Sequence, residues 1–484
     1  MILTDANSWS FDLTQFDYVW KIILQIILLL GFLLIGNMLR KLIPFLRKGN
    51  VPSALIGGLL LFLANLGFEA LGIQLVDKRI MQIVTYHALA IGFAAMAFKT
   101  AKKSNKASFL HTIQNGALTG GTYMLQGALG IIISLIFFWL GTNMFYDAGA
   151  LLPLGFGQGP GNALSWDVNF TEMENTFNGQ GSVGLTIASI GFIVASIGGV
   201  AYINIFKHKK QIVIRGANPQ RTVEEFEDEN EISDSESVDK MSIQVAFVLL
   251  SYGLAFGIMV FFAKLTDWTG VGLFNSVAWG FNFIWCVITA TLIKLFLNFL
   301  CNKKAIKQRY VNNYQMDRIS GFAFDVMIVA GVAAIDIKVV AEYIWLIVAL
   351  CVVGTVATFI YIRLMTKICF KGFEHEAFLT NYGALTGTAS NGMIFLREID
   401  PNYETPMNNV YIVSQFPAMI FVAPLLLLLN LSAESINGCY IALGIFSGLF
   451  VLYTVFMVLS GKGIIFKKKE KAVEEETPKL NRSD

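Results

Sequence analysis

The sequence predicts an all-α polytopic membrane protein. Of its 484 residues, 55% are hydrophobic and only 14% are charged, which lies outside the range of soluble globular proteins. Apolar runs long enough to cross a bilayer core of about 30 Å recur along the chain. Breaks rich in glycine and small polar residues interrupt them at 155–163 and 382–392. These observations predict about 11 transmembrane helices and two re-entrant segments.

The helix boundaries follow from the need for about 20 apolar residues per crossing. In the first half, helices are expected at 18–39, 51–69, 80–98, 109–141 and 179–206, with a break within 149–170. In the second half, they are expected at 241–264, 273–300, 319–335, 339–366 and 407–431, with a break within 378–398. A further helix is expected at 437–459. No cleavable signal peptide is expected, because the residues before Tyr18 are polar and acidic.

Lysine and arginine gather after the first, third, fifth and seventh predicted helices, within 40–48, 99–106, 207–221 and 303–318. Short cytoplasmic loops carry such an excess. The pattern places the amino terminus outside and the charged tail 467–484 in the cytoplasm, in a multi-pass protein of the plasma or inner membrane. Because the basic residues are divided among short loops, they give no argument for nucleic-acid binding.

This loop assignment requires that neither glycine-rich break crosses the bilayer. An arm of about eight to ten residues spans roughly 12–15 Å as helix, or half of the hydrocarbon. Each break is therefore expected to be a re-entrant hairpin, at 149–170 and 378–398. Five helices and one hairpin make up each half, so the halves 18–206 and 241–431 form an inverted-topology repeat. The acidic segment 207–240 joins them as a disordered tether or a phosphorylation segment, and the helix 437–459 lies outside the repeat.

The two hairpin tips are the candidate binding site. Glycine and proline disfavour helix, so the first tip should be extended or sharply bent. Half-helix amino termini attract an anion, and unwound carbonyl groups can ligate sodium. The candidate residues are Gly157, Gln158, Gly159, Gly161, Asn162, Thr386, Gly387, Thr388, Ser390 and Asn391. Alternatively, the glycines spaced by four residues could serve only close helix packing.

Asp325 is the best-placed ionisable residue within a predicted span. It could ligate the coupling cation, carry a proton, or pair with a neighbouring helix to hold the fold. Polar residues of the fourth and tenth helices could line a cavity or form hydrogen bonds between helices. They are Gln114, Asn115, Gln126, Ser414 and Gln415.

These features predict a sodium-coupled symporter for a small organic anion. No cofactor is expected. Sodium is the expected coupling ion, and its candidate ligands are Asp325, Thr388, Ser390 and Asn391. Proton coupling through Asp325 is an alternative, and a channel or membrane receptor is another. The sequence contains no phosphate loop, zinc-ligand cluster or nucleophile elbow, so an enzyme is not expected.

The segments 51–60, 155–163 and 383–391, in their order and spacing, resemble the bacterial sodium/glutamate symporter family. The resemblance extends from about Val19 to Leu431. It implies glutamate or a related amino acid or dicarboxylate as the substrate, a homodimer, and elevator-like movement of a hairpin-bearing domain against a scaffold. The first tip departs from the family's Gly-Gly-His-Gly-Thr-Gly at 158–162. The second tip lacks the family's proline but keeps hydroxyl groups at Thr388 and Ser390.

Overall fold

The computed structural model is helical throughout, with no strand in the residues that it describes. These are residues 20–49, 51–99, 109–142, 144–173, 177–209, 212, 240–270, 273–305, 310–401 and 404–464. Of the predicted linker 207–240, only 207–209, 212 and 240 are among them. The predicted tail 467–484 lies outside the described residues.

Ten of the described helices are long and apolar enough to cross a membrane. They are α1 (Lys21–Leu42), α3 (Ser53–Ala70), α4 (Lys78–Phe98), α5 (Phe109–Trp139), α8 (Ser182–His208), α9 (Lys240–Thr269), α11 (Asn282–Asn302), α13 (Ile337–Cys369), α16 (Met407–Glu434) and α17 (Ile436–Gly461). This is the architecture of a polytopic helical membrane protein.

The sequence predicted about 11 spans, and the difference lies in α12 (Asn313–Ala333). This helix has 21 residues but contains Asp317, Arg318 and Asp325, so it is less apolar than the other ten. The single helix expected at 273–300 is also wrong. It is divided at Phe281 into α10 (Leu273–Gly280) and α11, because the backbone of Phe281 (φ −119°, ψ 35°) leaves the helical region.

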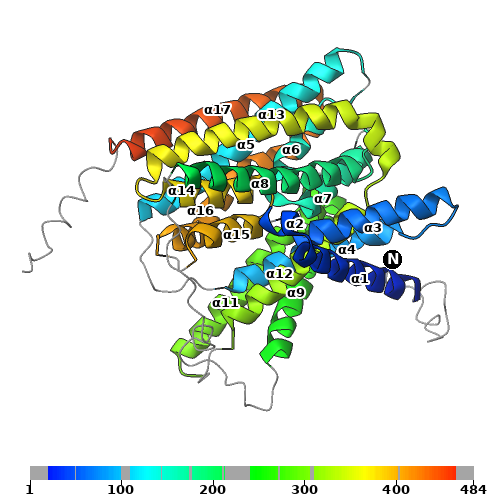
Figure 1. The fold of residues 1–484 in the computed structure, drawn as a ribbon, viewed down its shortest axis with the longest axis horizontal. Helices are drawn as coiled ribbons and strands as arrows, with labels where there is room; N and C mark the ends of the chain where they lie inside the picture. Colours follow the sequence, from blue (N-terminus) through cyan, green and yellow to red (C-terminus); the bar gives the residue numbers. More distant parts are fainter. Residues whose placement is uncertain are drawn as a thin grey trace, which may run out of the picture.

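The helices pack as two groups (Figure 1). The first bundle contains α1, α3, α4, α9, α10, α11 and α12, with α4 and α12 at its centre. The second bundle contains α5, α8, α13, α16 and α17, together with the short helices α6 (Leu151–Pro153), α14 (Glu374–Thr386) and α15 (Ala389–Ile399). Helix α7 (Pro160–Met173) packs on α8 in the second bundle and also on α4, α10 and α12 in the first. The bundles therefore meet around α7.

Helices α1 and α5 show how burial differs across the molecule. In α1 only Leu29 and Gly36 are buried, and large apolar side chains such as Leu34 are exposed. Lipid can cover such a face at no cost. Most of α5 is buried, including Asn115 and Gln126. Polar side chains are costly in lipid, so their place is the interior of the bundle.

Ion pairs join α4 and α12 at both of their ends. Lys78 Nζ lies 2.9 Å from Asp336 Oδ2 at one end, and Lys99 Nζ lies 2.6 Å from Asp317 Oδ1 at the other. Burial would raise the pKa of Asp336, but its hydrogen bonds from Lys78 and from the Lys338 amide, with the charge of Lys78, hold that pKa below its usual range. The two helices therefore run antiparallel and are pinned at each end.

Candidate functional site

The first tip was expected to be extended or sharply bent, and the structure shows a sharp bend at Gly159 after a chain that is helical up to Gln158. A 3-10 turn η2 (Ala148–Ala150) and α6 lead into a π-helical turn, η3 (Leu154–Gln158). The chain then bends at Gly159, with φ 80° and ψ −176°, and Pro160 begins α7. A wider π turn accommodates the glycines without an extended segment. The break is therefore confined to one residue, followed by proline at the first helical position, where proline is favoured.

The other glycines of this run allow close approach to three different helices. A Cβ at Gly155 would lie 2.7 Å from the Ile187 side chain of α8. At Gly157 it would lie 2.5 Å from the Tyr123 hydroxyl oxygen of α5, and at Gly161 it would lie 2.7 Å from Leu89 of α4. Real Cβ atoms do not approach so closely. The repeated glycines therefore let the tip pack against α4, α5 and α8 at once.

The second predicted tip is a helix–break–helix unit. Helix α14 ends at Thr386, Gly387 and Thr388 have non-helical backbone, and α15 begins at Ala389. The two arms lie close together, since a Cβ at Gly383 would come 2.8 Å from the Gly392 amide nitrogen. Neither Gly387 (φ −135°) nor Thr388 (φ −142°) has a positive φ. The close packing between the arms therefore needs Gly383 and Gly392, whereas the backbone reversal needs no left-handed residue.

The two tips lie against each other. A Cβ at Gly159 would lie 3.4 Å from Thr388 Cγ2 and 3.6 Å from Met327 Cε of α12. Helix α8 contacts both hairpins, because a Cβ at Gly184 would meet the Ala163 carbonyl group and one at Gly191 would lie 2.5 Å from the Thr386 carbonyl oxygen. Segments more than 200 residues apart in the chain are thus brought into one place.

Asn162 and Asn391 occupy equivalent positions at the two tips. Each is the third residue of its half-helix, α7 or α15, and they are 0% and 5% exposed. Both amide atoms of Asn162 and the Nδ2 atom of Asn391 are buried without a hydrogen-bond partner, as is Gln158 Oε1. Buried polar atoms are nearly always hydrogen-bonded in native proteins. Unpartnered atoms gathered at one place therefore indicate a site that a ligand completes.

Other predicted residues of the second tip serve its local structure. The Thr386 hydroxyl donates to the Tyr382 carbonyl oxygen at 2.6 Å, and the Gly387 amide donates to the Gly383 carbonyl oxygen at 3.1 Å. Thr388 precedes the first residue of α15, and no side-chain hydrogen bond caps that helix. Ser390 lies in the first turn of α15. The Asn391 and Gly392 amides both donate to the Thr388 carbonyl oxygen, so the first-turn amides without an acceptor in α15 are those of Ala389 and Ser390.

The structure does not bring Asp325 to the tips. Met327 and Gly331 of α12 face the first tip, since a Cβ at Gly331 would lie 3.0 Å from Pro160. Val329, one turn beyond Asp325, instead packs against Gly58 of α3. Helical periodicity puts Asp325 on that same side, where Arg40 of α1 is the charged group that acts on it. Asp325 therefore faces α1 and α3.

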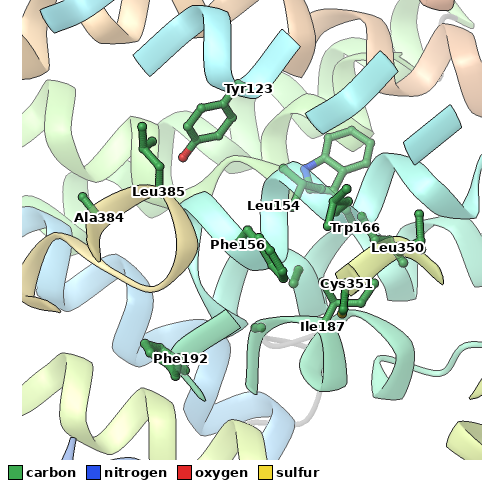
Figure 2. Close-up of a cluster of buried hydrophobic side chains, with 14 of the residues drawn as sticks. Tyr123, Leu154, Phe156, Trp166, Ile187, Phe192, Leu350, Cys351, Ala384 and Leu385 are labelled. Atoms are coloured by element: carbon green, nitrogen blue, oxygen red, sulfur yellow. The ribbon is translucent and has the colours of Figure 1, made fainter. Parts of the chain in front are cut away.

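Tyr123 and Met327 reach the tips although the sequence did not single them out. The Tyr123 hydroxyl adjoins Gly157 and forms a hydrogen bond with Gln158. Figure 2 shows Tyr123 beside an apolar cluster in which Leu154 and Phe156 of η3 lie near Leu385 of α14. A tyrosine and a methionine in apolar helices carry no pattern that marks them as site residues. The sequence feature that could have drawn attention to Tyr123 is the presence of Gln114, Asn115 and Gln126 in the same helix, α5.

Those polar residues form hydrogen bonds between helices. Asn115 Nδ2 donates to Ser414 Oγ at 2.8 Å, and Asn381 Nδ2 donates to Asn115 Oδ1 at 2.8 Å. Gln126 Nε2 donates to Thr358 Oγ1 at 2.9 Å and to the Leu385 carbonyl oxygen at 3.1 Å. Of the two roles that the sequence left open, the structure thus shows the interhelical one for these side chains. Gln126 also holds the carboxyl end of α14 immediately before the tip.

Two buried carboxylates fasten the hairpins to the helices that follow them. Asp167 of α7 accepts the Gly181 and Gly184 amides, at 2.9 and 2.7 Å, at the start of α8. Asp400, directly after α15, accepts the Glu404 and Thr405 amides at 2.8 and 2.9 Å, shortly before α16. Both carboxylates are fully buried. Each outer arm is therefore tied to the next helix in the same way.

No protein-family model matches the chain, and no curated protein is significantly similar to it. The resemblance to sodium/glutamate symporters therefore rests on the motifs alone. Within the described part of the chain, no three histidine, cysteine, aspartate or glutamate side chains gather in a way that could hold a metal ion.

Proposed function

We propose that this protein is a sodium-coupled secondary symporter that imports a small organic anion, glutamate or a related amino acid or dicarboxylate. The observation that carries the proposal is the meeting of two half-helix amino termini, each with a buried asparagine whose Nδ2 atom lacks a hydrogen-bond partner. Non-helical backbone at membrane depth is tolerated where it lines a polar site, and helix amino termini favour anions.

An inverted-topology repeat is supported by equivalent packing in the two halves. Helix α3 packs on α12, and its counterpart α11 packs on α4. Likewise α1 packs on α3, and α9 packs on α11. The equivalent carboxylates Asp167 and Asp400 extend the correspondence to the hairpins. In this proposal η2 to α7 forms the first re-entrant hairpin and α14 with α15 forms the second, while α17 is the helix added to the repeat.

Alternating access would arise from movement between the two bundles. Helix α7 carries the first tip and lies between them, so a change in its contacts with α4, α10 and α12 would alter access to the tips. The resemblance favours an elevator-like movement and a homodimer. The loop charges favour a plasma or inner membrane protein with its amino terminus outside and its carboxyl terminus in the cytoplasm.

Sodium would bind to neutral oxygen atoms near the tips. The unpartnered Gln158 Oε1 and Asn162 Oδ1 atoms are available, and Thr388, Ser390 and Asn391 remain candidates at the second tip. Asp325 would then act only indirectly, because it faces α1 and α3. Proton coupling through Asp325 is the competing hypothesis, and it requires that Asp325→Asn abolish uptake driven by a pH gradient.

Uptake into liposomes tests the function. Purified protein should accumulate labelled glutamate or dicarboxylate under an inward sodium gradient and should catalyse counterflow of the same solute. Equal uptake when potassium replaces sodium would rule out sodium coupling. Flux that does not saturate with solute would instead indicate a channel, and binding without flux would indicate a receptor.

A further inference from the structure

We infer that the substrate is a dicarboxylate without an ammonium group, held with one carboxylate at each half-helix amino terminus. The inference rests on the proposed function and narrows its substrate class. It depends on three features of the tips: two equivalent anion positions, two unpartnered amide donors, and the neutral character of the surrounding side chains.

The two anion positions are the starts of α7 and α15. These half-helices have 14 and 11 residues, and both begin where Gly159 lies against Thr388. Pro160 has no amide hydrogen, and the Asn391 amide already donates to the Thr388 carbonyl oxygen at 2.9 Å, so the first-turn donors are the amides of Gly161 and Asn162 in α7 and of Ala389 and Ser390 in α15. They lie at the positive end of each helix dipole. A monocarboxylate bound in the first turn of one half-helix leaves the other half-helix without an anion. A molecule with a carboxylate at each end serves both.

The asparagine donors strengthen each position. Side chains at the third position of a helix lean back toward its amino terminus. Asn162 Nδ2 and Asn391 Nδ2 are both buried and unpartnered, and Asn391 Nδ2 lies close to the backbone of Gly387. Each amide can therefore donate to a carboxylate bound at its own half-helix. Hydrogen bonds to a charged group are about twice as strong as those between neutral groups.

No carboxylate among the described residues is placed to receive an ammonium group at the tips. The side chains found there are neutral: Tyr123, Gln158, Asn162, Met327, Thr388 and Asn391. Three buried aspartates are engaged elsewhere, Asp147 with Ser432, Asp167 with the start of α8, and Asp400 with Glu404 and Thr405. The buried Glu376 lies in the first turn of α14, at the opposite end of that helix from the tip. Asp325 faces α1 and α3. An ammonium buried without a counter-charge is costly, and the coupling cation would use the free oxygens.

Matched ligand pairs test the inference. Succinate differs from aspartate, and glutarate from glutamate, only by the ammonium group. In sodium buffer, each dicarboxylate should raise the unfolding temperature of the full-length protein at concentrations about tenfold lower than its amino-acid partner, a difference that corresponds to about 1.4 kcal/mol. Sodium-driven uptake into liposomes should follow the same order.

Binding and uptake of these compounds can contradict the dicarboxylate assignment without contradicting the symporter proposal. Sodium-driven uptake of glutamate or aspartate, with equal or weaker binding of the dicarboxylates, would overturn the inference and leave the symporter proposal standing. Binding of acetate or propionate as tight as that of succinate would overturn the requirement for two carboxylates. If no compound of the series binds or is transported with sodium, both proposals fail.

A charge-adding variant locates the site. Asn391→Asp keeps the size of the side chain, places a carboxylate at the second tip, and should weaken succinate binding about tenfold or more while favouring aspartate over succinate. Asn430→Asp is the matched control, because Asn430 is equally buried but lies near the distant end of α16. An unchanged ratio of succinate to aspartate affinity in folded Asn391→Asp would contradict the assignment. Should that variant fail to fold, Asn162→Asp gives the same test at the first tip.

Discussion

At the first tip the chain bends at Gly159, with a φ of 80°, whereas at the second tip it reverses through Gly387 and Thr388 with negative φ values. Proline begins the half-helix at the first tip and alanine begins it at the second. Despite these differences, each half-helix has a buried asparagine as its third residue. Different residues can therefore produce the backbone reversal, whereas the position of the asparagine is the same at both tips.

The glycines of the two tips have two different roles. Only Gly159 needs its conformational freedom, because its φ and ψ angles lie in a region that is nearly restricted to glycine. Gly155, Gly157 and Gly161 are needed because side chains of neighbouring helices lie where a Cβ would be. At the second tip the crowding partner of Gly383 is Gly392, so there the glycines allow one arm to approach the other.

The equivalence of the two asparagines is tested by removing each. If the protein works as proposed, Asn162→Ala and Asn391→Ala should each reduce sodium-driven uptake roughly 10- to 100-fold, since each would lose the proposed hydrogen bond to a bound carboxylate. A hydrogen bond to a charged group is worth about 1.5–3 kcal/mol. Initial uptake rates in liposomes, at matched protein content, measure the effect. Asn430→Ala is the control and should keep normal uptake. A large loss at one tip with none at the other would show that the tips are not equivalent.

The difference in backbone between the tips predicts unequal tolerance of alanine. Gly159→Ala should lower the free energy of unfolding by about 1–3 kcal/mol, because an L-residue is strained at this φ and ψ. Thr388→Ala, in extended backbone, should be much milder. Thermal unfolding in detergent compares the two variants. Equal melting temperatures for Gly159→Ala and the unmodified protein would disprove the strained conformation.

The contact of Tyr123 with the first tip predicts a smaller effect. Tyr123→Phe removes the hydrogen bond with Gln158, a neutral interaction worth about 0.5–1.5 kcal/mol, and should reduce uptake roughly two- to tenfold. Kinetics at several sodium concentrations would measure it. Tyr453→Phe is a matched control, because its hydroxyl donates to the Phe421 carbonyl oxygen away from the tips. If both variants behave alike, Tyr123 has no special role at the tip.

The ion pairs of α4 and α12, which hold the first bundle beside the tips, predict the smallest effect. The pKa of Asp336 is lower in the folded protein than its usual value near 3.8, so the unfolded chain takes up the proton more readily. The contribution of Asp336 to stability is therefore full at neutral pH and is lost as pH falls through the folded pKa, below about 4.

The contribution of Asp336 to the free energy of unfolding should be within about 1 kcal/mol, as for other partly exposed ion pairs. Melting curves between pH 7 and pH 3 should show a shallower acid-induced loss for Asp336→Asn than for the unmodified protein. Parallel curves for the two proteins would contradict the assigned pKa direction.

Much of the helical pattern could be predicted from the sequence, because membrane crossing imposes a length and a polarity on each segment. The predicted starts of α16 at 407 and α5 at 109 match the structure. The division at Phe281 was missed although Gly280 and Asn282 flank it, because single glycine and asparagine residues also occur inside continuous membrane helices. The candidate tips were found because glycine and proline are conspicuous among apolar residues.

The rest of the candidate site depended on contacts between distant segments. Asp325 was conspicuous as a charge in a predicted span, yet helix rotation turns it toward α1 and α3. Met327, two residues later and chemically unremarkable, faces Gly159 instead. The packing of α12 against α3 and α4 determines which face of α12 meets the tips. The sequence of α12 alone does not show which of its faces this will be.

Local hydrophobicity and backbone sterics were enough to predict, from the sequence, a helical membrane protein with helix breaks at the two tips, although not the break at Phe281. The contact between Gly159 and Thr388, and the burial of the Asn162 and Asn391 Nδ2 atoms without hydrogen-bond partners, became known only from the tertiary structure. These facts arise from the packing of α7, α8, α14 and α15 across a separation of more than 200 residues. No local preference encodes such a meeting.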